Sequence, residues 1–411
     1  MDLDRLLLRI SELGASDLHL KLGQPPLIRH DGSIEPVEGY SALTDADLEG
    51  AVATLTQTAP ERRELFGSSG ELDIGYEVSG LRFRVNAFRQ RGAISVVCRV
   101  IPREIPDFEK LHMPAGVRRL ADEHRGLVLV TGATGSGKST TLASMIDHIN
   151  RTRRQHVITI EDPIEMLHPD RESIVNQREV GIDTVSFAQA LRRALRQDPD
   201  VILIGELRDS ETAETALQAA ESGHLVFSTM HTLDAAETIS RMIEFFPGVK
   251  QPMIRSILAG VLRGVVSQRL LPMVDGGRTA AVEVMVVNDR IAELIRESRA
   301  DEIPTAIREG TFFDMQTLPQ ALLDLCLAGL VDRDTATNAA PNAHDFLLAL
   351  NHAEKTRAVE EAAAAQNASA VVPPSPEPGH YGGGDPENGG PAYGGTDTPD
   401  PHPYAPLGSP S

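Results

Sequence analysis

The segment 132–139 has the residue types and spacing that bind a polyphosphate. Its sequence, GATGSGKS, matches G-x-x-x-x-G-K-[ST], follows a predicted strand and precedes a predicted helix over 140–149. Glycines let successive backbone N–H groups curl around phosphate oxygens, and the helix N-terminus favours negative charge. Lys138 is expected to neutralise the β- and γ-phosphates, and Ser139 to offer its hydroxyl to Mg²⁺. The predicted nucleotide-binding residues are Gly132, Ala133, Thr134, Gly135, Ser136, Gly137, Lys138, Ser139 and Thr140.

The sequence also indicates which nucleotide binds. The Asn/Thr-Lys-x-Asp signature by which GTPases read guanine is absent from the chain, which favours ATP with Mg²⁺.

Two further predicted strands run into acidic residues. Residues 157–160 lead to Glu161, and residues 201–204 lead to Gly205 and Glu206. Ligands of an open parallel sheet bind beyond the carboxyl ends of its strands. Phosphoryl transfer needs a held Mg²⁺ and an oriented water. We therefore assign Glu161 as the water-activating base and Glu206 as the acid on the metal side. The reverse assignment stays open, because Gly205 stands where an aspartate usually ends such a strand, and ordinary solvated carboxylates are the alternative.

Two histidines bracket the next predicted strand. His224 precedes residues 225–228 and His231 follows them. A neutral imidazole at His231 is expected to sense loss of the γ-phosphate through a hydrogen bond, whereas His224 is expected to couple to the sheet. A purely structural role is the alternative for both. No third ligand is evident, so a metal site at this pair is not expected.

The apolar pattern predicts the elements that position these residues. Strands that are apolar on both faces belong to a buried parallel sheet, and helical stretches between them give the βαβ pattern. Before residue 102 the pattern is mixed. It predicts a strand over 17–22, a helix over 43–55 with Thr44 as its N-cap, and an antiparallel meander. The buried strands are predicted over 127–130, 157–160, 201–204 and 225–228, and the meander over 72–78, 81–88 and 93–100.

The composition is that of a globular chain with an unusual end. Fifty-nine acidic against 39 basic residues give a net charge of −20, which argues against general duplex binding. The two cysteines, Cys98 and Cys326, cannot form a four-thiolate zinc site. The sequence has no apolar run of about 18 residues that would span a bilayer. Nine Gly and eleven Pro in residues 367–411 predict a disordered tail.

Several long motifs, in a fixed order, resemble the secretion-superfamily ATPases of type IV pili and type II secretion. The resemblance is strongest to the twitching-motility, pilus-retraction (PilT-type) branch, and it covers roughly residues 1–345. It rests on residues 15–34, 81–102, 132–141, 158–165, 198–209, 222–232 and 291–298.

The resemblance implies an α/β fold in four parts. These are a PAS-like α+β domain over 1–101, a linker over 102–115, a RecA-like P-loop ATPase domain over 116–350 and an acidic Pro/Gly-rich tail over 351–411. The ATPase domain is expected to hold a mostly parallel sheet and C-terminal helices. Arg82, Arg84 and Arg99 lie on strands that match those supplying arginines to the nucleotide. Such arginines stabilise transition-state charge, although alternate arginines also suit a solvated face.

The resemblance further implies a hexameric cytosolic ATPase that powers pilus retraction. It would act through its own copies and an inner-membrane platform protein at the cytoplasmic face of the membrane, without direct nucleic-acid contact. The lack of a tetracysteine module and of a long extra N-terminal domain favours retraction over extension. Two alternatives remain: an accessory or regulatory ATP-binding subunit with low turnover, and a RecA-like nucleic-acid motor, against which the net charge speaks.

Overall fold

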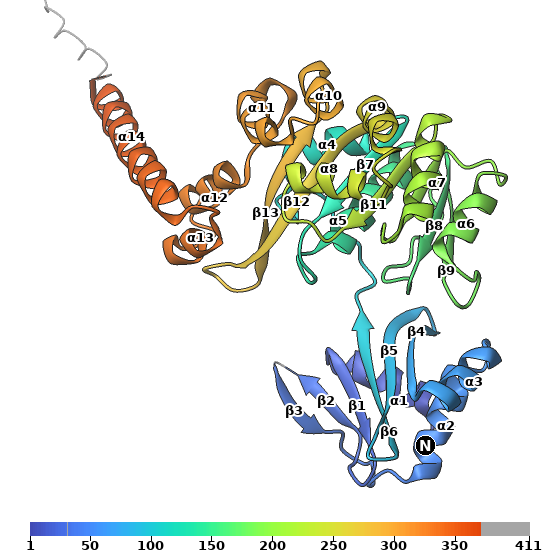
Figure 1. Cartoon of the computed structure of the whole chain (residues 1–411). Helices are drawn as coiled ribbons and strands as arrows, with labels where there is room; N and C mark the ends of the chain where they lie inside the picture. The colour runs from blue at the N-terminus through green and yellow to red at the C-terminus, as the bar shows by residue number, and fades with distance from the viewer. Residues whose placement is uncertain (31, 371–411) are drawn as a thin grey trace, which may run out of the picture. The chain divides into compact units, whose positions relative to one another are not determined.

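A seven-stranded sheet carries the predicted nucleotide-binding residues (Figure 1). The structure, a computed structural model, describes residues 1–30 and 32–370. The sheet order is β13-β12-β7-β11-β10-β8-β9, with all neighbours parallel except β12 and β13. The mostly parallel sheet is thereby confirmed. Its strands are β7 (Gly126–Thr131), β8 (His156–Glu161), β9 (Ile174–Glu179), β10 (Val201–Ile204), β11 (Leu225–Met230), β12 (Leu262–Pro272) and β13 (Arg278–Val286).

Helices cover this sheet, so β7, β10 and β11 are buried at every residue. Among these helices, α4 (Ala115–Ala121) packs against α5 (Lys138–Thr152). Helix α7 (Ser210–Glu221) packs against both α6 (Phe187–Ala194) and α9 (Gln251–Val261). Strands covered on both faces lose their alternating polarity, which is why the sequence shows continuous apolar runs there. The remaining helices of this part are α8 (Ala235–Glu244), α10 (Asp289–Arg296), η1 (Ala300–Glu302), α11 (Ile303–Glu309) and η2 (Thr311–Phe313).

A six-stranded antiparallel sheet forms the N-terminal part, in the order β3-β2-β1-β6-β5-β4. Its apolar core includes Leu7, Leu18, Phe83 and Val96, all fully buried. The predicted meander corresponds to β4, β5 and β6. The elements are α1 (Leu3–Glu12), β1 (Asp17–Lys21), β2 (Leu27–His30), β3 (Ser33–Pro36), α2 (Asp45–Leu55), α3 (Pro60–Ser69), β4 (Glu71–Val78), β5 (Leu81–Gln90) and β6 (Ala93–Ile101).

The predicted N-cap at Thr44 is confirmed. The Thr44 hydroxyl accepts a hydrogen bond from the Asp47 N–H, and the Asp47 carboxylate accepts one from the Thr44 N–H. This reciprocal pair is a capping box, which satisfies two backbone donors at the helix start.

The segment predicted as a linker is packed against the ATPase sheet from about Pro106 onward. The Ser144 hydroxyl of α5 donates to the Pro106 carbonyl at 2.6 Å, and the Phe108 side chain is buried in the core of the ATPase part. Residues Met1–Lys355 form one compact unit. This unit holds both the N-terminal sheet and the ATPase sheet.

Three helices end the described part of the chain. They are α12 (Leu318–Leu327), α13 (Arg333–Ala339) and α14 (Ala343–Ala370). Leu271 of β12 and Ala281 of β13 join the apolar cluster of α12 and α13. Residues 351–370, which the sequence analysis assigned to the tail, continue α14, because an alanine-rich stretch favours helix. The tail prediction for 371–411 lies outside the described residues. No helix of the described residues is both long and apolar enough to cross a bilayer.

Candidate functional site

The phosphate loop joins β7 to α5 through three glycines with positive φ. Gly132, Gly135 and Gly137 have φ values of 139°, 80° and 93°, a region that residues with a Cβ rarely adopt. Gly132 is also required for space, since a Cβ there would lie 2.4 Å from the Gln268 carbonyl oxygen. The glycine spacing found in the sequence is thus a requirement of this backbone path.

Lys138 begins α5 and lies at the mouth of the loop. Its ammonium donates to the carbonyls of Gly132 and Ala133 at 2.9 and 3.0 Å. Burial lowers the pKa of this ammonium, while the charges of Glu206 and Glu165 oppose that shift. A cation held at a helix N-terminus suits a polyphosphate.

Strand β12 supports the loop from behind. The Gln268 amide donates to the Ser136 carbonyl at 2.7 Å, and the Thr131 hydroxyl donates to that of Ser267 at 2.9 Å. The next residue, Arg269, donates to the Ala339 carbonyl at the end of α13. Neighbouring residues of one strand therefore contact the phosphate loop and the C-terminal helices.

Glu161 ends β8 in a partly buried, hydrogen-bonded position. Its Oε1 accepts from the Thr159 hydroxyl at 2.6 Å and from the Gln177 amide at 3.2 Å. Burial raises the pKa of this carboxyl, and those two hydrogen bonds partly oppose the shift. A carboxylate whose pKa lies closer to neutrality is a more effective general base.

Glu206 follows β10 in a more polar setting. It forms an ion pair with Arg208, and its Oε2 lies 3.4 Å from His231 Nε2. Its side chain is largely buried, whereas those of Arg208 and His231 are exposed. The two acids, to which the sequence assigned different roles with the reverse left open, therefore differ in setting: Glu206 has cationic or titratable partners, and Glu161 has neutral ones.

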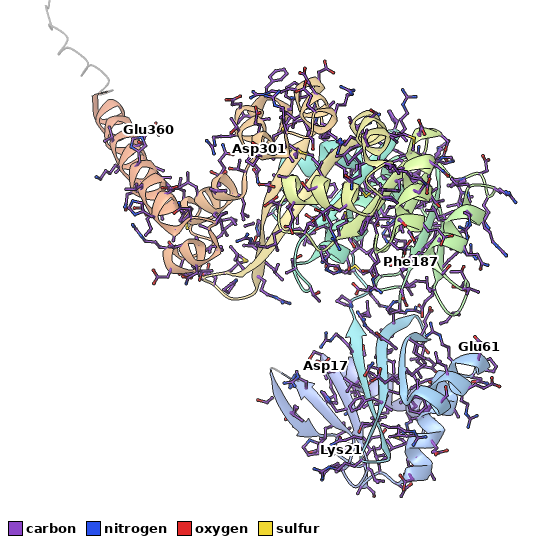
Figure 2. The ribbon with its side chains drawn as sticks, viewed as in Figure 1. Asp17, Lys21, Glu61, Phe187, Asp301 and Glu360 are labelled. Atoms are coloured by element: carbon purple, nitrogen blue, oxygen red, sulfur yellow. The ribbon has the colours of Figure 1, made fainter. Side chains whose placement is uncertain are left out.

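Gly205 departs from the usual acid for a steric reason. A Cβ at this position would lie 3.3 Å from both the Ile160 carbonyl oxygen and the Phe187 ring. Phe187, labelled in Figure 2, begins α6 and lines the same cleft as the phosphate loop. An aspartate at 205 would require that ring to move.

The two histidines occupy different settings. His231 faces Glu206, as above, and lines the cleft. His224 Nδ1 lies 3.0 Å from the Ala219 carbonyl and 3.1 Å from the Ser222 hydroxyl, at the C-terminal end of α7. His224 thus contacts the helix end that leads into β11, in keeping with a structural position.

Two of the three predicted arginines line the cleft. Arg84 donates to Asp73 at 3.0 Å and to Glu165 at 3.2 Å, and the hydrogen bond that it donates to Asp73 raises the pKa of its guanidinium. Arg99 donates to Asp17 at 2.9 Å. Asp17, which is labelled in Figure 2, is buried. Burial disfavours its charge, but hydrogen bonds from Ser16 and Arg99 outweigh burial and lower the pKa of the carboxyl.

Arg82 has a different partner. Its guanidinium pairs with Glu179 of β9 and donates to the Ile164 carbonyl at 3.4 Å. The structure therefore brings Arg84 and Arg99 to the phosphate loop, and it places Arg82 against another element. Sequence spacing could not separate them, because Arg82 and Arg84 share one face of β5.

Most of the predicted site residues enclose one cleft of about 660 Å³, but Gly132, Ala133, Ser136 and Arg82 do not line it. Gly132, Ala133 and Ser136 contribute backbone carbonyls to the loop, as described above. Sequence reasoning missed Phe187, Leu270 and Arg278, whose approach to the loop depends on tertiary packing. The predicted residues that line the cleft are Thr134, Gly135, Gly137, Lys138, Ser139, Thr140, Glu161, Glu206, His231, Arg84 and Arg99.

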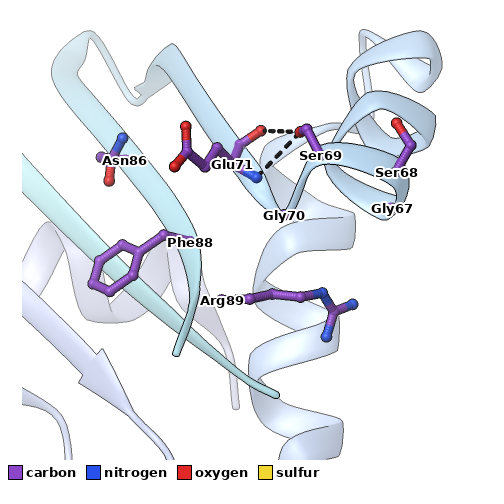
Figure 3. A pocket seen from close by; sticks show the side chains of 8 residues that line it. All are labelled: Gly67, Ser68, Ser69, Gly70, Glu71, Asn86, Phe88 and Arg89. Carbon is purple, nitrogen blue, oxygen red and sulfur yellow. Dashed lines mark hydrogen bonds between the residues drawn. The ribbon is translucent and has the colours of Figure 1, made fainter. Parts of the chain in front are cut away.

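A second hollow, of about 530 Å³, lies in the N-terminal part (Figure 3). Gly67, Ser68 and Ser69 of α3 border it, together with Glu71, Asn86 and Arg89. The Ser69 hydroxyl donates to the Glu71 carbonyl and accepts from the Glu71 N–H. These two bonds are local to the end of α3. The side chains that border this hollow do not form a set of charged or nucleophilic groups aimed at one point.

The fold and the cleft define a P-loop nucleoside triphosphatase with a RecA-like sheet, in which arginines of a second sheet face the phosphate loop. The family model described as "Type II/IV secretion system protein" matches residues 68–276. The chain belongs to this family, and it is an ATPase.

Three similar proteins place it more finely. The chain is 45% identical to "Type IV pilus retractation ATPase PilT" of Pseudomonas aeruginosa over 347 residues, which is 84% of this chain and 100% of that protein. It is 39% identical to "Type IV pilus ATPase PilU" of the same organism, covering 85% of this chain and 91% of that protein. A crystal structure of the pilus retraction motor PilT with bound ADP matches with a TM-score of 0.77 and 44% identity, over 84% of this chain and 98% of that one.

Proposed function

We propose that this chain is a type IV pilus retraction ATPase that works as a homohexamer at the cytoplasmic face of the membrane. The observation that carries the proposal is the cleft itself, where a phosphate loop, two strand-end carboxylates and two arginines of the N-terminal sheet converge. The full-length similarity to a protein named as a pilus retraction ATPase supports the biological role.

The cleft has the charges that splitting a triphosphate requires. Lys138 and the N-terminus of α5 bind the phosphates, and Arg84 and Arg99 face them from the N-terminal sheet. Positive charge on both sides stabilises the negative charge that spreads over the transferring phosphoryl group. Closing the two sheets on the nucleotide would thus couple hydrolysis to domain motion.

The two carboxylates divide the remaining work. Glu161, held by Thr159 and Gln177, orients the attacking water and accepts its proton, since burial favours the protonated carboxyl. Glu206 stays near the loop in contact with His231. His231 reports loss of the γ-phosphate to the β11 end through that contact.

The residues present suit Mg²⁺. The Ser139 hydroxyl and the Glu206 carboxylate both line the cleft, and hard oxygen ligands are those that Mg²⁺ prefers. Ser139 and Glu206 would hold the ion, directly or through water. It would supply charge neutralisation at the β- and γ-phosphates.

The motor would need partners to do mechanical work. Copies of this chain would form the ring, and an inner-membrane platform protein would receive the motion, so that the ATPase meets the membrane only through that partner. The net charge of −20 fits a role without direct nucleic-acid contact.

Phosphate release by the purified full chain tests the enzymatic part. Wild type should turn over ATP with Mg²⁺ as a hexamer in solution, while Lys138→Ala and Glu161→Ala should not turn over. A chain that stays monomeric with every nucleotide would overturn the ring.

A gene deletion tests the biological part. Cells should still extend pili but fail to retract them, and the wild-type gene should restore retraction where Lys138→Ala does not. Because the chain is also 39% identical to PilU, an accessory ATPase is the second candidate. Retraction that persists in the deletion strain would favour it.

A further inference from the structure

We propose that Arg82 and Glu179 form a latch that positions the N-terminal sheet, so that Arg84 and Arg99 face the phosphate loop. Arg82 is thus a positioning residue and makes no contact with the nucleotide. The inference rests on the ATPase activity stated above, and it adds a residue, Glu179, that no motif in the sequence indicated.

Glu179 is the centre of the latch. Its side chain is 3% exposed, and that of its partner Arg82 is 12% exposed. One carboxylate oxygen accepts from the Gly75 N–H of β4 at 3.0 Å, and the other accepts from the Ile164 N–H at 3.2 Å. With Arg82, three donors from two parts of the chain satisfy one buried carboxylate. Such charge-assisted bonds are strong, and a buried charge that loses its partner is costly.

Two glycines make this approach possible. A Cβ at Gly75 would lie 2.0 Å from a terminal nitrogen of Arg82 and 2.7 Å from Glu179 Oε2. In the ATPase part, shortly after β9, a Cβ at Gly181 would lie 1.6 Å from a terminal nitrogen of Arg62, which belongs to α3. Arg62 donates to the carbonyls of Val180 and Gly181 at 2.8 and 3.0 Å. Gly75 of the N-terminal part thus leaves room for Arg82 and for Glu179 of β9, and Gly181 of the ATPase part leaves room for Arg62 of the N-terminal part.

The latch lies beside the reacting groups. Glu179 is directly opposite Glu161 in the β8–β9 register. Ile164, which Glu179 binds, precedes Glu165, which accepts from Arg84. Arg82 is two residues from Arg84 on one face of β5, and Arg84 is paired with Arg99 across β5 and β6. A shift at Arg82 therefore moves both arginines of the cleft relative to Glu161.

A double-mutant cycle in the full chain tests the latch. Arg82→Ala, Glu179→Gln and the double variant are compared for kcat and KM of ATP, and for affinity for a fluorescent ADP. Because misplaced arginines weaken the transition state more than the ground state, each variant should lower kcat about tenfold and leave ADP affinity within about twofold. The double variant should be no slower than either single one, because both remove the same interaction.

Gly75→Ala tests the latch without removing a charge, and Gly67→Ala is its matched control. Gly67 lies in α3 of the same part of the chain, where a Cβ would meet no atom within 4 Å (Figure 3). Gly75→Ala should lower kcat as Arg82→Ala does, and Gly67→Ala should match wild type. Thermal melting shows whether each variant is folded.

Hydrogen exchange without nucleotide gives a readout that does not depend on turnover. The amides of Gly75 and Ile164 should exchange slowly in wild type and faster in Gly75→Ala and Glu179→Gln. Slow exchange in a wild type that hydrolyses no ATP would contradict the ATPase assignment and keep the latch. Two results would overturn the latch. One is additive losses with a much slower Arg82→Ala, which would mean that Arg82 reaches the nucleotide. The other is wild-type kcat and exchange in every variant.

Discussion

The two sheets of this molecule prepare the nucleotide cleft in different ways. In the ATPase sheet, the residues that line the cleft lie at strand ends, where a loop, a helix start and two carboxylates follow buried strands. In the N-terminal sheet, the functional residues are arginines on the face of the strands, and they form ion pairs with Asp17, Asp73 and Glu179. In the first arrangement, the reactive residues directly follow their strands along the chain. The second depends on partners that are distant in sequence, so it can be re-formed or released as a unit.

The largest expected effect is at the locally fixed side. Lys138→Ala should lower ATP turnover by about a thousandfold or more, because no other cation begins α5 to bind the phosphates. Phosphate release measures this, and an unchanged melting temperature shows that the fold is intact. Turnover above a tenth of wild type would mean that the loop does not anchor the reacting phosphates.

Glu161→Gln should lower turnover by about a hundredfold or more while leaving ATP binding intact, since a general base is lost without loss of volume. Glu206→Gln should weaken the Mg²⁺ dependence of turnover instead. Titration of Mg²⁺ in both variants separates the two roles. A shifted Mg²⁺ requirement in Glu161→Gln alone would reverse the assignment.

Arg84→Ala examines the face of the N-terminal sheet. It should retain nucleotide affinity and lose about ten- to a hundredfold in turnover, because charge stabilisation is needed mainly in the transition state. Arg89→Ala, on the same strand but bordering the second hollow, is the control and should turn over normally. Equal turnover in both variants would remove Arg84 from the site.

A pH profile sharpens the view of Glu161. Burial raises the pKa of this carboxyl, and hydrogen bonds from Thr159 and Gln177 oppose the rise. Turnover needs the deprotonated form, so it should fall as pH decreases through the raised pKa. Gln177→Leu removes one opposing bond and should move that acid limb to higher pH. An acid limb that stays in place would show that Glu161 is not the titrating base.

The smallest expected effect concerns His224, which contacts the C-terminal end of α7. His224→Ala should lower the free energy of unfolding by about 1 kcal/mol through lost hydrogen bonds and leave kcat unchanged. Denaturant unfolding and phosphate release check the two parts. A loss of kcat without a loss of stability would place His224 in the reaction.

The sequence predicted most of what is locally encoded. The loop glycines, the capping box at Thr44 and the buried strands β7, β8, β10 and β11 follow from spacing and apolar runs. Strand β12 was missed, because Leu262 follows the last residue of α9 directly, with no turn segment between helix and strand. The polar strand β9 was also missed, since its residues pair at a sheet edge.

The sequence alone could not predict which partner each arginine and each glutamate of the site contacts. Arg82 and Arg84 differ by two positions and share a residue type and a face, yet only long-range packing sends one to Glu179 and the other to Glu165. The same holds for the contrast between Glu161 and Glu206, whose settings depend on the more distant residues Gln177 and His231. The roles assigned to these residues remain predictions that the variants above address.

Strand β12 has a mechanical consequence. Gln268 holds the phosphate loop and Arg269 holds the end of α13, and adjacent Cα atoms are about 3.8 Å apart. A covalent backbone this short cannot stretch, so a displacement of the loop that carries Gln268 with it also pulls on the C-terminal helices. Helix α13 is thereby tethered, through one peptide bond, to the place where phosphates bind.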